Sequence, residues 1–77
     1  MSIHIKFFAR LREMLGKNEI TIELEGEQTI EQIWLLATDN TPMPSNTLCA
    51  INMEYVDINS LVSDGDEIAF FPPVTGG

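Results

Sequence analysis

Apolar residues recur at every second position in several short stretches of the chain. The stretch IHIKF at residues 3–7 and the stretch ITIEL at residues 20–24 both alternate apolar side chains with polar ones. A period of two residues is typical of a strand with one buried face. The pattern therefore predicts strands over 3–7 and 20–24, a fully apolar strand over 48–51, a brief pairing at 55–56 and a last strand over 67–71.

A helical period replaces this alternation in the middle of the chain. Thr29 followed by Gln32 matches a capping box. Four apolar residues then share one helix face, namely Ile30, Ile33, Trp34 and Ala37. The proline-containing segment 39–47 cannot continue this helix. A shorter helix is predicted over 10–15, because Gly16 follows it where a C-terminal cap belongs.

These elements predict an α+β fold in a single domain. A chain of 77 residues has room for one small core, so one main helix must cover one face of a mixed sheet of about five strands. The first and last strands are expected to be central neighbours, as in a βα(+β) roll. The domain is predicted to span residues 1–71, with an extended tail over 72–77. The uncovered sheet face is then open to water or to a partner.

Three aromatic residues stand out because of their positions in the predicted strands. Phe8 has the opposite parity to Phe7, and Phe71 has the opposite parity to Phe70. If the parities hold, Phe8 and Phe71 lie on the uncovered face, joined there by Tyr55. A patch of this kind usually marks a binding site. Strand ends also twist, so the alternative is that both rings fold back into the core.

Charge is unevenly spread along the chain, whose net charge is −8. All four basic residues lie within the first 17 positions, whereas residues 18–77 hold eleven acids and no base. This distribution disfavours nucleic-acid binding, because no basic stripe exists to contact phosphates. It favours a partner with a positive surface. The alternative is that the acids simply keep a small protein soluble.

The apolar content of the chain is not concentrated in a membrane-spanning run. No apolar stretch approaches the roughly 20 residues that a span requires, and the first residues lack the features of a signal peptide. The single cysteine, Cys49, leaves no partner for an internal disulfide. The sequence therefore predicts a soluble, cytoplasmic protein without membrane attachment.

The usual catalytic groups do not form a recognisable pattern. His4 is the only histidine and is expected on the surface, while Cys49 lies between apolar neighbours and is expected to be a small buried residue. Nothing near Thr75 could act as its base, and no metal site can be built at the usual ligand spacing. A self-sufficient enzyme is therefore disfavoured.

The remaining candidate for chemistry is the tail itself. Pro72 and Pro73 stiffen its base. Gly76 and Gly77 have no Cβ atoms, so their backbone can enter a narrow channel. A free carboxylate is a poor electrophile, but as an acyl-adenylate with AMP it becomes open to attack by sulfur or nitrogen. We therefore predict that the terminal carboxylate of Gly77 is the reactive group.

Two stretches make this prediction more specific. The ending LVSDGDEIAFFPPVTGG, together with KFFARLRE near the start, closely resembles the family of molybdopterin synthase small subunits. These are ubiquitin-like sulfur carriers of the MoaD/ThiS type. The resemblance covers the chain from end to end and is strongest at the tail. It implies the β-grasp (ubiquitin-like) fold, in agreement with the roll predicted from the strand pattern.

The resemblance also implies a reaction and its partners. In that family the C-terminal glycine, here Gly77, is adenylated by an ATP-using activating enzyme and converted to a thiocarboxylate, with sulfur from a donor such as a cysteine desulfurase system. The tail then enters the large synthase subunit, in a heterotetramer of two large and two small subunits, and passes its sulfur to cyclic pyranopterin monophosphate. The carrier itself binds no cofactor, and the active site is expected on the large subunit.

Individual positions can be carried over from the family by their match to its motifs. The resemblance assigns the tail-insertion and partner-binding roles to Phe8, Tyr55, Phe71, Pro72, Pro73, Val74, Thr75 and Gly76. Arg12 matches a basic position of the family, and its role is not evident from the sequence. The segment 39–47, DNTPMPSNT, matches no signature of the family, so it leaves finer contacts with the partner open.

Three other functions remain open at the level of sequence. A thiamine-pathway sulfur carrier shares the Gly-Gly ending and the thiocarboxylate, but it does not usually carry the ending FFPPVTGG. A ubiquitin-like protein modifier would use the same activated glycine to form bonds with lysines. A plain β-grasp interaction module would have an inert tail.

Overall fold

The computed structural model describes residues 1–73, and it places five strands and two helices in the order that the sequence pattern predicts. The elements are β1 (Ser2–Phe7), α1 (Arg10–Leu15), β2 (Glu19–Glu23), α2 (Ile30–Ala37), β3 (Leu48–Ile51), β4 (Glu54–Val56) and β5 (Glu67–Phe71). Three strands begin one residue earlier than predicted. Val74, Thr75, Gly76 and Gly77 lie outside the described residues.

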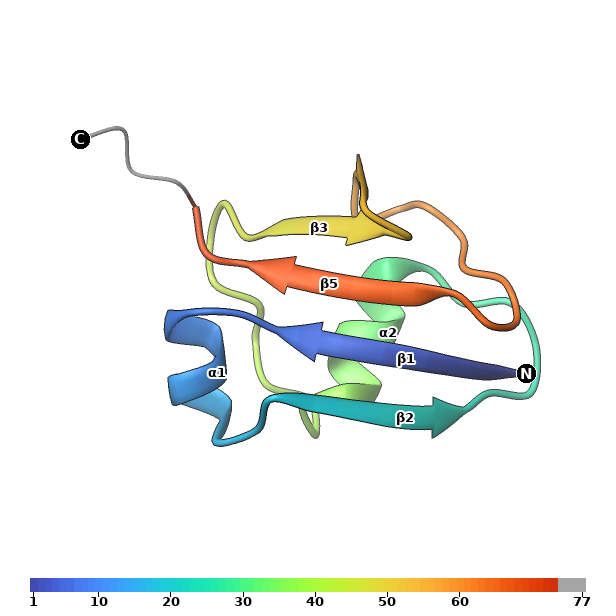
Figure 1. The fold of residues 1–77 in the computed structure, drawn as a ribbon, viewed down its shortest axis with the longest axis horizontal. Coiled ribbons are helices and arrows are strands. Elements are labelled where there is room, and N and C mark those ends of the chain that lie inside the picture. Colours follow the sequence, from blue (N-terminus) through green and yellow to red (C-terminus); the bar gives the residue numbers. More distant parts are fainter. Residues whose placement is uncertain (74–77) are drawn as a thin grey trace.

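The strands form one mixed sheet in the order β2-β1-β5-β3-β4 (Figure 1). The central pair, β1 and β5, is parallel, whereas the other three neighbouring pairs are antiparallel. The prediction that the first and last strands are central neighbours is confirmed. Because β1 and β5 run in the same direction, their carboxyl ends lie together, and β5 leads from there into Pro72 and Pro73.

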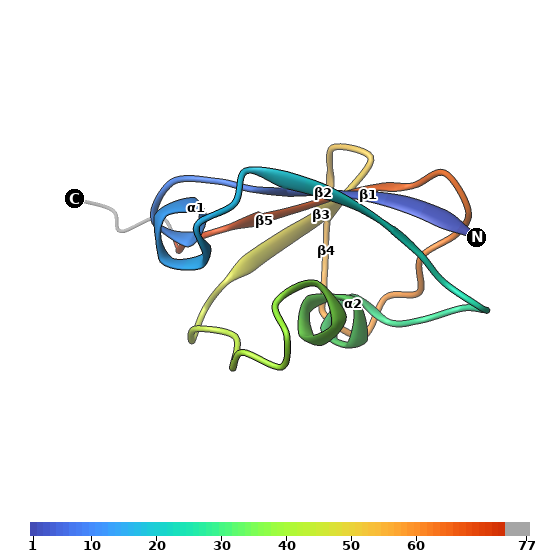
Figure 2. The same ribbon diagram turned by 90° about the horizontal axis from the view of Figure 1, so that it is seen from below.

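Helix α2 packs against one face of this sheet and closes the core (Figure 2). Its N-terminus is fixed by the predicted capping box, in which the Thr29 hydroxyl accepts from the Gln32 amide at 3.2 Å and the Gln32 side chain accepts from the Thr29 amide at 2.9 Å. Trp34 is fully buried and lies edge-on to Phe7 and Phe70, with ring centroids 5.9 and 4.9 Å away.

The other face of the sheet carries no helix among residues 1–73. In β1 and β5 buried residues alternate strictly with partly exposed ones, so that Ile68 and Phe70 face α2 while Glu67, Ala69 and Phe71 face outward. This arrangement is the β-grasp fold that the sequence indicated. Neither helix within the described residues is long and apolar enough to cross a membrane.

Candidate functional site

An aromatic cluster lies on the uncovered face, at the carboxyl ends of the two central strands. The rings of Phe8 and Phe71 are stacked, with centroids 4.8 Å apart and planes inclined by 10°, and the ring of Tyr55 lies 6.0 Å from Phe71. Phe8 is 38% exposed and Tyr55 is 70% exposed. Of the two interpretations left open by the sequence, the structure supports the surface position over the core position for these rings.

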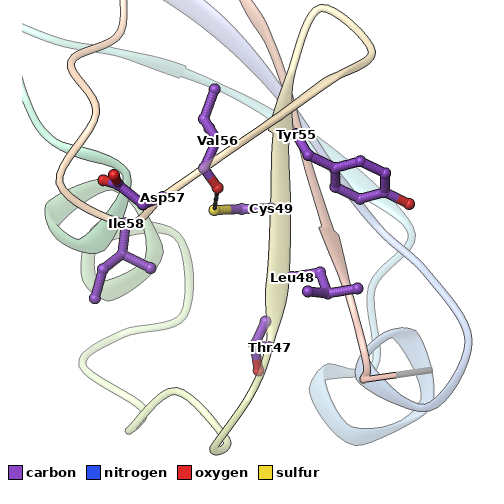
Figure 3. Close-up of a pocket in the computed structure, with 7 residues that line it drawn as sticks. All are labelled: Thr47, Leu48, Cys49, Tyr55, Val56, Asp57 and Ile58. Carbon is purple, nitrogen blue, oxygen red and sulfur yellow. Dashed lines mark hydrogen bonds between the residues drawn. The ribbon is translucent and has the colours of Figure 1, made fainter. Parts of the chain in front are cut away.

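Leu48 completes this cluster, although no pattern in the sequence pointed to it. Its backbone pairs directly with Phe71 across β3 and β5, which puts the two side chains on the same face. Figure 3 shows Leu48 and Tyr55 pointing to one side of β3 and Cys49 to the other. We call Phe8, Leu48, Tyr55 and Phe71 the aromatic patch. With Ala9, Pro72 and Pro73 these residues line a hollow of about 400 Å³.

Alanines extend the aromatic patch toward the middle of the sheet. Ala50 and Ala69 pair with each other across β3 and β5 and help to line a second hollow of about 390 Å³. Because their side chains are small, they project less from the sheet than the neighbouring aromatic rings do. The face therefore has the shape of a shallow apolar depression that another protein surface could fill.

Charged side chains border this depression and continue across the uncovered face. The Lys6 ammonium lies 3.6 Å from the Glu67 carboxylate, and His4 Nε2 lies 3.4 Å from a carboxylate oxygen of Glu19. His4 Nδ1 is also within 3.0 Å of the Thr21 hydroxyl. Each of these side chains is partly exposed, so the pairs contribute little stability. His4 is thus a surface residue, as expected, and it has cross-strand partners.

The sharp turn between β1 and α1 holds Phe8 on the uncovered face. Ala9 has φ 54° and ψ −128°, a region that residues with a Cβ atom rarely adopt and that costs of order 1–3 kcal/mol. The turn allows Leu11 to enter the core, where it is 3% exposed. Phe8 is fixed at the same time, because its amide donates to the Phe70 carbonyl at 3.1 Å.

Cys49 is buried beneath the edge of the sheet and does not resemble a nucleophile. It is 3% exposed, and its thiol donates to the Val56 carbonyl oxygen at 3.2 Å (Figure 3). Burial, with a further contribution from the Asp57 carboxylate, raises the pKa of the Cys49 thiol above its ordinary value. The prediction that Cys49 is a small buried residue is confirmed. No group of three metal-ligating side chains occurs in the part of the chain that the structure describes.

We expect the Cys49 thiol to react slowly in the folded protein. Only the thiolate reacts, and its formation requires local opening, so alkylation by iodoacetamide at pH 8 should be roughly tenfold or more slower than in urea. The raised pKa of Cys49 also makes the stability of the protein depend on pH. The stability that this shift contributes is fully present below the pKa of the thiol in the unfolded chain, and it is lost as the pH rises from that value through the pKa in the folded protein. Equal alkylation rates with and without urea would contradict the buried position.

The residues of this surface lie within a segment that matches a known protein family. The model of the ThiS family matches residues 5–77, which include all four residues of the aromatic patch.

The chain belongs to the ThiS family.

Individual relatives agree with this assignment over their whole length. The molybdopterin synthase sulfur carrier subunit of Haemophilus influenzae is 38% identical, over 97% of this chain and 99% of its own. Among solved structures, SAMP1 from Haloferax volcanii superimposes with a TM-score of 0.79 at 26% identity, with both chains covered completely. A third match is one chain of the protein–protein complex of subunits 1 and 2 of the molybdopterin-converting factor from Helicobacter pylori. It superimposes with a TM-score of 0.67 at 21% identity, with both chains covered completely, and this shows that the fold is shared.

The structure therefore brings together part of the set of residues that the sequence singled out. Phe8, Tyr55 and Phe71 lie in one patch, and Pro72 and Pro73 border it. Val74, Thr75, Gly76 and Gly77 are outside the described residues, so their assigned roles stay predictions. Arg12 is exposed and lies near Phe8, where both help to line a small hollow with Lys6.

Proposed function

We propose that this protein is the sulfur carrier subunit of a molybdopterin synthase. The observation that carries the proposal is the near full-length match to a relative with that function, at 38% identity. The position of the aromatic patch supports it independently. A carrier needs a docking surface next to its tail, and here an exposed apolar patch borders the two prolines that lead into the tail.

The proposed chemistry takes place on Gly77. A carboxylate oxygen of Gly77 attacks the α-phosphorus of ATP on an activating enzyme, which forms the acyl-adenylate and releases pyrophosphate. Sulfide, which a thiol reductant releases from the persulfide of a donor such as a cysteine desulfurase system, then attacks the carbonyl carbon and expels AMP. The product is a thiocarboxylate, in which one oxygen of the carboxylate has been replaced by sulfur. The carrier needs no bound cofactor for either step.

The second half of the proposal concerns the partner. The aromatic patch docks on the large synthase subunit, and the segment from Pro72 to Gly77 enters the active site of that subunit. Sulfur then passes to cyclic pyranopterin monophosphate, and two such transfers build the dithiolene of molybdopterin in a heterotetramer of two large and two small subunits. Support comes from the Helicobacter pylori structure, which is a protein–protein complex of two subunits of the same kind of factor.

An intact-mass measurement tests this proposal most directly. The protein is incubated with ATP, its activating enzyme and a sulfur source, and its mass is compared with that of a sample without ATP. We expect a gain equal to the exchange of one oxygen for one sulfur, localised to Gly77 by fragmentation. An unchanged mass, with an activating enzyme of proven activity, would contradict the proposal.

A protein-modifier role is the second candidate, because SAMP1 from Haloferax volcanii, one of the small archaeal modifier proteins, shares the fold at 26% identity. This role predicts conjugates of higher mass in cell extract that disappear when Gly77 is removed. A thiamine-pathway carrier would instead co-purify with a thiazole synthase, and an inert module would function unchanged without its last two residues. Each outcome differs from co-purification with a large molybdopterin synthase subunit.

A further inference from the structure

A separate hollow lies against Pro72 and Pro73 on the side away from the aromatic patch. Its other walls come from elements that do not contribute to that patch. Its volume is about 400 Å³. Helix α1 contributes Arg10, Leu11 and Met14, the segment between α2 and β3 contributes Pro44 and Ser45, and the two prolines after β5 complete the lining. We call this hollow the α1 groove. It includes part of the segment 39–47, which matched no signature of the family.

The walls of the α1 groove are held in place by the core. The Trp34 indole Nε1 donates to the Thr41 carbonyl at 2.7 Å, and the Thr47 hydroxyl donates to the Pro44 carbonyl at 2.7 Å. The first of these hydrogen bonds attaches the start of the segment 41–47 to α2, and the second stabilises a turn at its end. On the opposite wall, Leu11 is anchored in the core at 3% exposure. The groove is thus formed before any partner binds.

Pro72 and Pro73 connect the α1 groove to the aromatic patch. Both prolines line the hollow of the aromatic patch and also line the groove. A protein that encloses the chain beyond Pro73 must approach both of these hollows. The groove is therefore continuous with the docking surface of the proposed function.

The charge around the α1 groove differs from that of the rest of the molecule. Arg10 and Arg12 are exposed, and neither has a carboxylate within ion-pair distance among residues 1–73. Both lie at the end of the molecule where β5 finishes, whereas residues 18–77 contain eleven acids and no base. The net charge of −8 favours a positive partner overall, but the surface that faces Arg10 should be acidic.

We propose that the α1 groove is a second docking site for the large synthase subunit, which inserts an apolar side chain against Met14 and places a carboxylate beside Arg10. Met14 is 50% exposed and offers the apolar surface, while Arg10 at the rim offers a guanidinium that has no carboxylate within ion-pair distance among residues 1–73. The inference rests on the proposed function, because it names a further contact of the same partner. The large subunit then contacts Pro72 and Pro73 from two sides, through the aromatic patch and through the α1 groove.

A matched pair of substitutions tests this inference. Met14→Glu places a carboxylate in the groove, and Leu36→Glu makes the same change of charge on α2, where Leu36 is 57% exposed and lines neither hollow. Binding of each folded variant to the large synthase subunit is measured by isothermal titration calorimetry. We expect Met14→Glu to weaken binding by about tenfold or more and Leu36→Glu to leave it within about twofold. Arg10→Gln should weaken binding mainly at low salt.

A fourth variant separates failure of this inference from failure of the proposed function. Phe8→Glu disrupts the aromatic patch and should weaken binding in either case. If Phe8→Glu weakens binding while Met14→Glu binds like the parent, the groove inference is wrong and the proposed function stands. If the parent protein does not bind a large subunit that is active with its own carrier, both are wrong. Circular dichroism spectra of all four variants establish that each is folded.

Discussion

Deletion of Gly77 is expected to lower sulfur transfer by at least about 100-fold while leaving the domain folded. The deletion moves the terminal carboxylate back by one residue, or roughly 3.3–3.6 Å along an extended chain. Reacting atoms must approach within about 3–3.5 Å, and a misplacement of only about 1 Å can cost 100-fold in rate. The measurement is the rate of molybdopterin formation by the large subunit with chemically prepared thiocarboxylate forms of both chains.

The control for this deletion is its stability. Within residues 1–73 the buried residues lie between Ile3 and Phe70, so loss of the last glycine should leave the urea midpoint unchanged. Leu36→Ala provides a second control, because Leu36 is 57% exposed on α2 and lines none of the hollows of the proposed docking surface, so the change should leave the rate as it is. If the shortened chain transferred sulfur at the parent rate, the position of the terminal carboxylate would be unimportant. That result would contradict the proposal that the protein is a sulfur carrier.

Replacement of Trp34 by alanine should be among the most destabilising single changes in the chain. Removal of a large buried aromatic side chain typically costs about 3–5 kcal/mol. A domain of this size has a total stability of only about 4–12 kcal/mol, at roughly 0.05–0.15 kcal/mol per residue. The indole also donates to Thr41 and contacts the rings of Phe7 and Phe70, so several groups lose a partner together.

Urea unfolding followed by circular dichroism measures this loss. Fluorescence is unsuitable, because Trp34 is the only tryptophan of the chain. Tyr55→Ala serves as the matched control: it also removes an aromatic ring, but one that is 70% exposed, and should change stability by no more than about 0.5 kcal/mol. Similar urea midpoints for the two variants would show that Trp34 is not the centre of the core.

Local patterns were sufficient to predict most of the fold. The alternation in β1 and β5 depends on a strand period of two, and the capping box at Thr29 depends on residues only three positions apart. Both signals are contained in short stretches of sequence. The parity of Phe8 and Phe71 followed from the same alternation, and this is why two members of the aromatic patch could be singled out.

The remaining parts of the site depend on contacts between distant segments. Leu48 joins the aromatic patch only because β3 pairs with β5 in a register that places it opposite Phe71, and a fully apolar strand gives no indication of which residue faces outward. The α1 groove requires α1, the segment 39–47 and the prolines after β5 to meet in space. No periodic pattern in the sequence links these three segments.

The parallel pairing of β1 with β5 has a consequence for how the molecule forms. His4 pairs with Glu67 and Phe7 with Phe70, so the centre of the sheet joins the two ends of the domain. Contacts between residues so far apart in sequence close late and slow the folding of small domains. A nascent chain that has not yet produced β5 lacks both the central strand and Phe71. The aromatic patch therefore comes into existence only with the finished domain, and incomplete chains have no assembled docking surface with which to compete for the proposed partner.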